Sequence, residues 1–254
     1  MTTSDGWVSA VRSRVGLGRL LPLGGPEDGA WVAERAADAV LRGAARKVPG
    51  VEPGRLRIAL TEAGPPAAPV FPPPPGSLPP GPLRIEADFA AGPGVPLPDL
   101  AERLRAALYT AAEVRLGLAV AEVDLRVTAL LDAPPPTTPP AQAHAPATDT
   151  PAPETAGADA RVAEDPAAAV AAAVPGVARL TTALGHSVHR AADHLRVELA
   201  TAPDHRALDV ARAVRGAVGG ELPVTVVVTD VAPEDRSGRS GQSESPARSR
   251  RRRA

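Results

Sequence analysis

The chain has 254 residues, 28 basic against 29 acidic side chains, 2% aromatic residues and no cysteine. Without cysteine it can form no disulfide, no thiolate zinc site and no cysteine nucleophile. With so few aromatic residues, any core must be built from Leu, Val, Ile and Ala, which favours two small domains over one large one in a chain of this length.

Residues 1–27 are predicted to form an N-terminal amphipathic segment that begins with a short helix. Four apolar side chains recur there at helical spacing, namely Trp7, Val8, Val11 and Val15. This face could cover the sheet of the first domain, or it could lie on a membrane surface or a partner protein. Asp5 and the lack of a continuous apolar run argue against a signal peptide. No stretch has the roughly 18 apolar residues of a membrane span, so we expect a cytoplasmic protein.

Residues 28–131 are predicted to form a first α+β unit of helix, strand, strand, helix and strand. Apolar residues fall on one face of a helix at about 28–46. The period then changes to two, as expected for a half-buried strand. The elements in chain order are that helix, a strand through Leu56, Ile58 and Leu60, a Pro-rich loop at 64–82, a strand at 83–89, a helix from Pro98 to near Gly117, and a strand through Val123, Leu125 and Val127.

The same order returns after a linker. Residues 132–161 are rich in Pro and Ala, contain no large apolar residue and are expected to be disordered. Residues 162–231 are then predicted to form a second α+β unit, in which "HLRVELA" corresponds to "PLRIEADFA" of the first unit. In this unit a strand through Leu180, Thr182 and Leu184 is followed by the polar loop "GHSVHRAAD". Because four blocks recur in the same order, we infer an internal duplication. Residues 232–254 are expected to be a disordered tail rich in Arg and Ser.

The helix that opens each unit ends in the same four residues, Val-Pro-Gly-Val. Pro49 and Gly50 stand in the first copy, and Pro175 and Gly176 stand in the second. Proline and glycine stop a helix and turn the chain, and the flanking valines can anchor the turn in the core. We therefore interpret these residues as structural turns at the start of each sheet.

The predicted fold class is α+β, with two small two-layer domains. In each unit two helices cover one face of a three-stranded sheet, and the first two strands can form a hairpin. Such a sheet leaves its other face and its edges to be covered. The other unit, the N-terminal segment or a partner protein could cover them.

This pattern resembles the alkaline shock protein family, the bacterial envelope stress response proteins of the Gls type. The resemblance covers about residues 30–131 and 162–231 and rests on "KVPGV" and "AVPGV", "LRIEADF" and "LRVELA", "LAERLRAAL" and "DVARAVRGAV", and "VDLRVTAL" and "VTVVVTDV". The chain departs from the family in having two units and in Pro49 and Pro175, where an acidic residue is common. It also resembles actinobacterial chains labelled as a nucleopolyhedrovirus structural family.

The resemblance to the alkaline shock proteins implies a non-enzymatic function. Proteins of this family are cytoplasmic, act near the membrane, and associate with a membrane-anchored partner and with each other. The family supplies no catalytic residues that could be transferred to this chain.

The sequence indicates no catalytic, cofactor or metal site. Its most obvious candidates are four histidines of the second unit, His186, His189, His194 and His205. No carboxylate motif accompanies them, so we interpret them as polar loop residues, with a metal-binding or pH-sensing role as the alternative. The glycines of "GLGRLLPLGG" lack the spacing of a phosphate-binding loop. We therefore expect no enzyme and no cofactor.

The tail carries the candidates for binding an anionic surface, which are Arg248, Arg250, Arg251, Arg252 and Arg253. Guanidinium groups can bind the phosphates of anionic lipids or of nucleic acids, although the tail could equally be a solvated segment. The predicted function is a scaffold or adaptor linked to cell-envelope stress or homeostasis, located in the cytoplasm or peripherally at the inner face of the membrane. A nucleic-acid-associated protein that uses the tail is the alternative.

Overall fold

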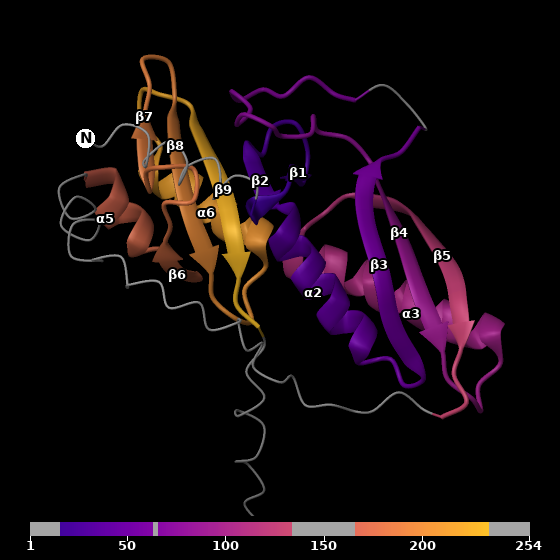
Figure 1. Cartoon of the computed structure of the whole chain (residues 1–254). Coiled ribbons are helices and arrows are strands. Elements are labelled where there is room, and N and C mark those ends of the chain that lie inside the picture. Colours follow the sequence, from indigo (N-terminus) through magenta and orange to yellow (C-terminus); the bar gives the residue numbers. More distant parts are fainter. Residues whose placement is uncertain (1–15, 63–65, 134–165, 234–254) are drawn as a thin grey trace, which may run out of the picture.

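The computed structural model describes residues 16–62, 66–133 and 166–233, which form an α+β fold with two sheets (Figure 1). The first sheet has the strand order β3-β4-β5, and the second has the order β1-β2-β9-β8-β6, with β7 also paired to β8. The strands are β1 (Leu20–Leu23), β2 (Ala30–Ala33), β3 (Val51–Leu60), β4 (Leu83–Ala91), β5 (Val120–Leu130), β6 (Val177–Leu180), β7 (Val188–Arg190), β8 (Leu195–Thr201) and β9 (Val224–Val231). The helices are α2 (Glu34–Arg46), α3 (Leu97–Thr110) with its wider final turn η1 (Ala111–Leu116), α5 (Pro166–Ala172) and α6 (Ala207–Val218).

The first unit has the predicted order of helix, strand, strand, helix and strand. Strand β3 pairs antiparallel with β4, and β5 returns parallel to β4 after α3. Alternate residues of β4 are buried, as the period of two predicts. They face the helices, where Leu100, Leu104 and Leu108 of α3 are also buried.

The second unit repeats this order with α5, β6, β8, α6 and β9. Helix α6 packs on β9, and α5 packs on α6 and β6. The pairing of β8 with β9 is again parallel. The two units therefore share the same order of elements and the same strand directions, as an internal duplication predicts.

Residues 28–33 do not belong to a helix, contrary to the sequence prediction. Helix α2 begins at Glu34, and Ala30–Ala33 forms strand β2, which pairs antiparallel with β1 and parallel with β9. All four side chains of β2 are buried. A strand inside a sheet that is covered on both faces has both of its sides buried, so its sequence is a continuous apolar run without alternation. The N-terminal part of the chain thus completes the second sheet.

The Pro-rich loop packs on this added part of the second sheet. The indole Nε1 of Trp31 in β2 donates to the carbonyl oxygen of Leu78 at 3.2 Å, and the hydroxyl of Thr225 in β9 donates to the carbonyl of Pro72 at 3.0 Å. Leu78 N donates to Leu20 O at 2.8 Å. The described residues of the loop are therefore held along β1 and β2 (Figure 1).

The second unit departs from the prediction between β6 and β8. The strand expected through Leu184 ends at Leu180, and the polar loop contains the short strand β7, which pairs antiparallel with β8. Both β6 and β7 share β8 as their partner, so the edge of the sheet is divided between two short strands. A strand of three residues is too short to show a period in the sequence.

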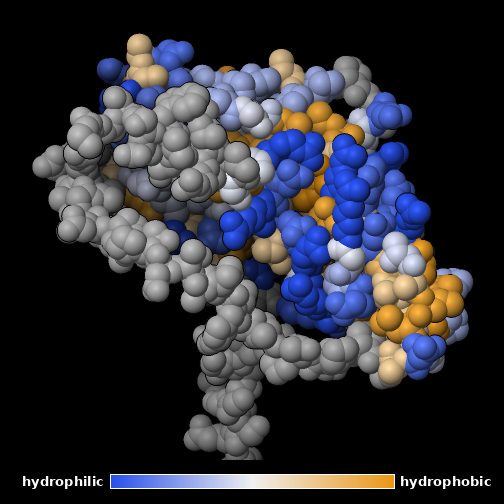
Figure 2. All heavy atoms as spheres, in the orientation of Figure 1, coloured by the Kyte–Doolittle hydropathy of each residue, from blue (hydrophilic) through white to orange (hydrophobic). Residues whose placement is uncertain are grey.

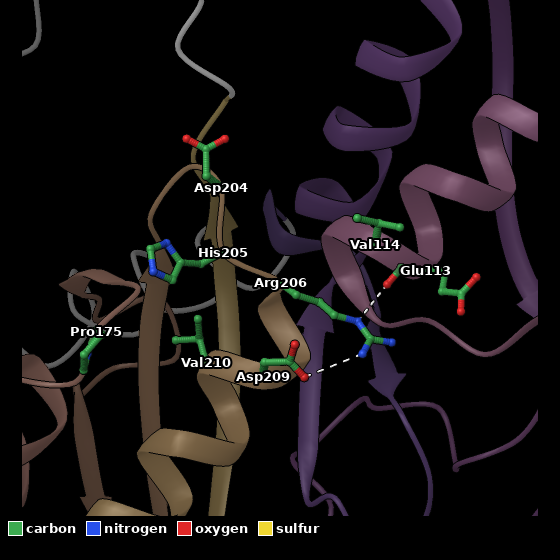
Figure 3. Close-up of a pocket in the computed structure, with 8 residues that line it drawn as sticks. All are labelled: Glu113, Val114, Pro175, Asp204, His205, Arg206, Asp209 and Val210. Carbon is green, nitrogen blue, oxygen red and sulfur yellow. Dashed lines mark hydrogen bonds and ion pairs between the residues drawn. The ribbon is translucent and has the colours of Figure 1, made fainter. Parts of the chain in front are cut away.

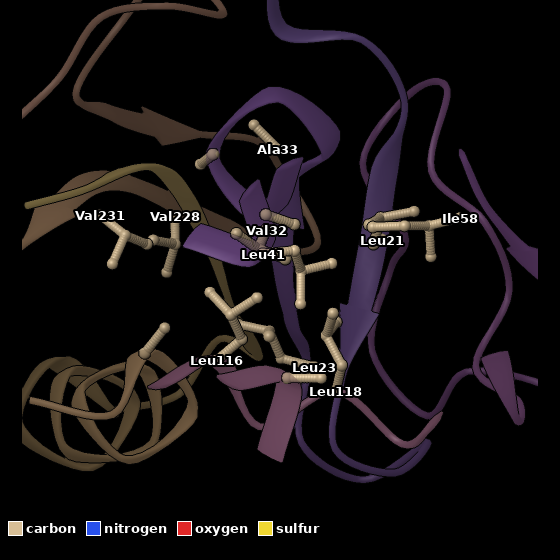
Figure 4. Close-up of a cluster of buried hydrophobic side chains, with 14 of the residues drawn as sticks. Leu21, Leu23, Val32, Ala33, Leu41, Ile58, Leu116, Leu118, Val228 and Val231 are labelled. Atoms are coloured by element: carbon tan, nitrogen blue, oxygen red, sulfur yellow. The ribbon is translucent and has the colours of Figure 1, made fainter. Parts of the chain in front are cut away.

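One hydrophobic core connects the two sheets. Leu21 of β1, Val32 of β2, Leu41 of α2, Ile58 of β3 and Val228 of β9 are all fully buried in a single cluster (Figure 4). Helix α2 lies at the centre of this arrangement, since it contacts both β3 and β9. The two units are therefore packed together around α2.

Candidate functional site

The Val-Pro-Gly-Val segments form the same turn in both units. Gly50 and Gly176 have positive φ angles of 86° and 90°. In the first unit Gly92 N donates to Gly50 O, and in the second Ala202 N donates to Gly176 O, each at 2.8 Å. Pro49 and Pro175 precede these glycines, so all four predicted turn residues lie where a helix ends and the first strand of a sheet begins.

The outer edge of β5 is the most distinctive surface of the first unit. Among the described residues β5 pairs only with β4. Two side chains of α3 reach its edge: Tyr109 donates to Ala121 O at 2.9 Å, and Arg105 Nε donates to Val123 O at 3.4 Å. Because backbone groups of alternate residues point the same way along a strand, the N–H and C=O groups of Leu125 and Val127 also face outwards.

Two comparable strand edges, those of β3 and β9, carry contacts that most of the β5 edge lacks. On β3, the opposite edge of the first sheet, Arg19 donates to Ile58 O at 2.5 Å and Arg42 donates to Gly54 O at 2.6 Å. In the second sheet, β9 stands where β5 stands in the first, and its outer edge is paired with β2. Within residues 16–62, 66–133 and 166–233, no strand pairs with the outer edge of β5 beyond Val123, whereas its counterpart in the second unit is closed by β2.

Apolar side chains are exposed at the carboxyl end of β5. Val127 is 39% exposed and Leu130 is 70% exposed. Leu97, at the start of α3, is 39% exposed. Figure 2 shows apolar residues gathered over this end of the first sheet, at the lower right of the view. A cluster of this kind beside an open strand edge is typical of a protein-binding surface.

The solvent face of the first sheet carries both acidic and basic side chains. Arg84 of β4 lies 2.5 Å from the carboxylate of Glu122 and 3.3 Å from that of Asp124, both on β5. The hydrogen bond from Arg84 to Glu122 is the main cause that raises the pKa of Arg84 above its usual range. Arg126, the next outward residue of β5, is exposed and makes no ion pair among the described residues.

A shallow groove of about 600 Å³ lies between η1 and the start of α6 (Figure 3). Arg206 points into it and is already engaged, since its Nε donates to Glu113 O at 2.8 Å and its guanidinium lies 3.6 Å from Asp209. His205 also lines the groove, but its Nδ1 is 3.1 Å from Pro203 O. The bond from Arg206 to Glu113 joins the second unit to the first, so we interpret the groove as part of the contact between the two units.

Three of the four histidines of the second unit lie together on the β7 hairpin. The ring centroids of His186 and His189 are 6.3 Å apart, and those of His189 and His194 are 6.4 Å apart. Burial, together with the charges of Arg196 and the neighbouring rings, lowers the pKa of His189. Within the described residues no group of three His, Cys, Asp or Glu side chains could hold a metal ion.

Two predicted binding elements cannot be placed. The amphipathic helix around Trp7 and the arginines from Arg248 to Arg253 lie outside the described residues. In the part of the chain that the structure describes, no helix is long and apolar enough to cross a membrane.

Comparison with known proteins adds no family assignment. No family model, no curated protein and no solved structure matches this chain. The most informative feature of the candidate site is the outer edge of β5, which the sequence did not single out.

Proposed function

We propose that this chain is a non-enzymatic scaffold or adaptor linked to cell-envelope stress or homeostasis, which binds proteins through the outer edge of β5. The observation that carries the proposal is the open edge of Leu125 and Val127 beside the exposed Leu130. Main-chain N–H and C=O groups at such an edge supply affinity for an added strand, and the neighbouring side chains supply specificity.

The link to the cell envelope rests on the resemblance to the alkaline shock proteins. It favours a cytoplasmic protein at the inner face of the membrane with a membrane-anchored partner. The arginines of the tail, Arg250 to Arg253 above all, would add contacts with anionic lipid. Nucleic acid is the alternative ligand of the same tail, because its phosphates offer guanidinium groups the same chemistry.

The experiment is a pull-down from the native cell with tagged full-length protein, followed by membrane fractionation. We expect a membrane-anchored protein to be recovered with the wild type. Val127→Lys with Leu130→Lys should reduce its recovery by about tenfold or more, because charges on an edge block strand addition. The matched control, Val114→Lys with Val170→Lys, places the same charges on exposed valines elsewhere and should leave recovery unchanged.

Equal recovery with both double variants would contradict the role of the β5 edge, and exclusively cytosolic partners would contradict the link to the envelope. Deleting residues 236–254 in the same fractionation tests the tail. Undiminished sedimentation with membranes would remove the tail from the proposal.

A further inference from the structure

The second unit shows where along β5 another strand could be added, although the strand added there, β2, runs parallel to its partner β9. Strand β4 pairs with β5 as β8 pairs with β9, with Ile85 opposite Val123 and Val197 opposite Val226. In the second sheet, β2 occupies the outer edge of β9 from Val226 to Val228. The corresponding stretch of β5 is Val123 to Leu125, so the open edge lies at the position where the duplicate unit accepts another strand.

The charges along β5 differ from those of β9. Val227 and Thr229 of β9 are neutral, whereas the corresponding residues of β5 are Asp124 and Arg126. These two opposite charges flank Leu125 on the solvent face of the sheet. The pairing of β4 with β5 shows no register shift from Val123 to Val127, so this stretch is regular strand.

Charges of opposite sign on either side of one residue are self-complementary in an antiparallel pair centred on that residue. If two β5 strands meet at Leu125, each Asp124 lies directly opposite the Arg126 of the other copy, and this happens twice by symmetry. On the inner face Val123 lies opposite Val127, and Leu125 lies opposite itself. All these are favourable cross-strand pairs.

The backbone is oriented for the same arrangement. The N–H and C=O groups of Val123, Leu125 and Val127 face the edge, so two copies could exchange about six main-chain hydrogen bonds. The bond from Arg105 to Val123 O is long, at 3.4 Å, and Arg105 also pairs with Glu102. A partner strand can therefore displace it at little cost.

We propose that a second copy of this chain occupies the edge of β5, by antiparallel β5–β5 pairing centred on Leu125, which joins two first sheets into one continuous six-stranded sheet. This inference rests on the proposed function, because it names one partner of the same edge. The exposed Val127 is covered in the dimer by Val123 of the other copy, and the ends beyond it remain accessible.

The test is sedimentation of full-length variants between about 1 and about 200 µM. Wild-type protein should dimerise reversibly. Asp124→Arg creates two Arg–Arg pairs and should raise the dissociation constant by about tenfold or more, and Arg126→Asp should do the same with two Asp–Asp pairs. The double variant D124R/R126D restores opposite charges and should return to within about threefold of the wild type.

The control is Glu52→Arg, which makes the same change of charge on β3, at the opposite edge of the sheet. It should dimerise as the wild type does. All variants should melt within about 4 °C of the wild-type monomer, because Asp124 and Arg126 are exposed. The variants with arginine at position 124 lose the 3.3 Å pair of Asp124 with Arg84, but exposed pairs contribute little and Arg84 retains its contact with Glu122.

Cross-linking tests the register. Because the chain has no cysteine, Leu125→Cys places one thiol on each copy directly opposite the other, within reach of a short bifunctional reagent. Leu125→Cys should cross-link, whereas Val127→Cys should not, because two residues 127 lie far apart in this register.

A monomeric wild type, equal dissociation constants for D124R and the double variant, or cross-linking of Val127→Cys in place of Leu125→Cys would each overturn the β5–β5 dimer. These outcomes are separate from the proposed function. Recovery of a membrane-anchored protein that depends on Val127 and Leu130 would stand even if the protein proved monomeric.

Discussion

At the scale of single residues, Asp28 ties distant parts of the chain together. Its carboxylate accepts hydrogen bonds from Arg212 Nε at 2.7 Å and from Gly25 N at 2.7 Å, and it is only 6% exposed. Burial alone would raise the pKa of Asp28, but the hydrogen bonds from Arg212 and Gly25 outweigh it and hold that pKa below its usual range. Asp28 thus connects the β1–β2 hairpin to α6.

We expect Asp28→Asn to lower the free energy of unfolding by about 1–2 kcal/mol at pH 7, because it removes the charged partner of Arg212 that lies 2.7 Å away. The other acidic neighbour of Arg212, the exposed Asp209, is 3.8 Å away and replaces little of this interaction. A depressed carboxyl pKa gives stability that is present above the unfolded-state pKa of about 4 and is lost as the pH falls through the lower folded-state pKa. The difference between wild type and variant in urea titrations should therefore shrink below about pH 4.

The exposed pair of Arg179 and Asp230, 2.9 Å apart with both side chains more than half exposed, provides the control. Asp230→Asn should cost about 0.5 kcal/mol or less. A pH-independent loss in Asp28→Asn would contradict the assignment of the stabilisation to the carboxylate charge.

At the scale of elements, the two Val-Pro-Gly-Val turns have the same backbone but different surroundings. A Cβ at Gly50 would meet Leu100 at 3.7 Å, an ordinary contact, whereas a Cβ at Gly176 would lie 2.6 Å from Val210 and 2.7 Å from His205. Val210 is buried on α6, so it has little room to yield.

Gly50→Ala should therefore cost only the penalty for a left-handed alanine, about 1–2 kcal/mol. Gly176→Ala should cost about 1–3 kcal/mol more, because overpacking is added to the same penalty. Thermal and urea denaturation of the two variants measure the difference. Equal losses would show that the contact with α6 relaxes freely.

The elements that local periodicity could predict were those with a clear amphipathic pattern. Alternation revealed β3 and β4, and the leucines of α3 recur on one face. Strand β2 was missed because its four apolar residues, Ala30–Ala33, have no period and pair with Val226–Val228, about 200 residues away in sequence. Val32 continues the helical spacing of Ala36 and Val40 in α2, so the predicted helix was extended towards the N-terminus and included the residues of β2.

The open edge of β5 was hidden for a related reason. Val127 alternates with Thr128 and Arg126 as a core residue does, so its pattern predicts burial. Only the topology shows that β5 is the outermost strand of its sheet and that Val127 and Leu130 lie at its exposed end. Turn residues, in contrast, carry local information, so Gly50 and Gly176 were placed correctly from the sequence.

At the scale of the whole molecule, the contacts between the units indicate that neither half is structurally independent. Beyond the pairing of β2 with β9, Arg206, which directly precedes α6, donates to Glu113 O at 2.8 Å, and Arg115 of η1 donates to Ala232 O at 3.1 Å. The second unit expressed alone would expose the apolar edge of β9, which is a template for aggregation.

Splitting the chain tests this dependence. Fragments 1–150 and 151–254, expressed together from separate genes with a tag on one, should copurify in equal amounts, because β2 still completes the second sheet. Fragment 151–254 expressed alone should aggregate. Asp28→Asn in the first fragment should weaken the association by about tenfold, the equivalent of about 1.4 kcal/mol, whereas Asp230→Asn in the second should not. Two soluble fragments that unfold cooperatively and do not bind each other would show that the shared sheet is dispensable for folding.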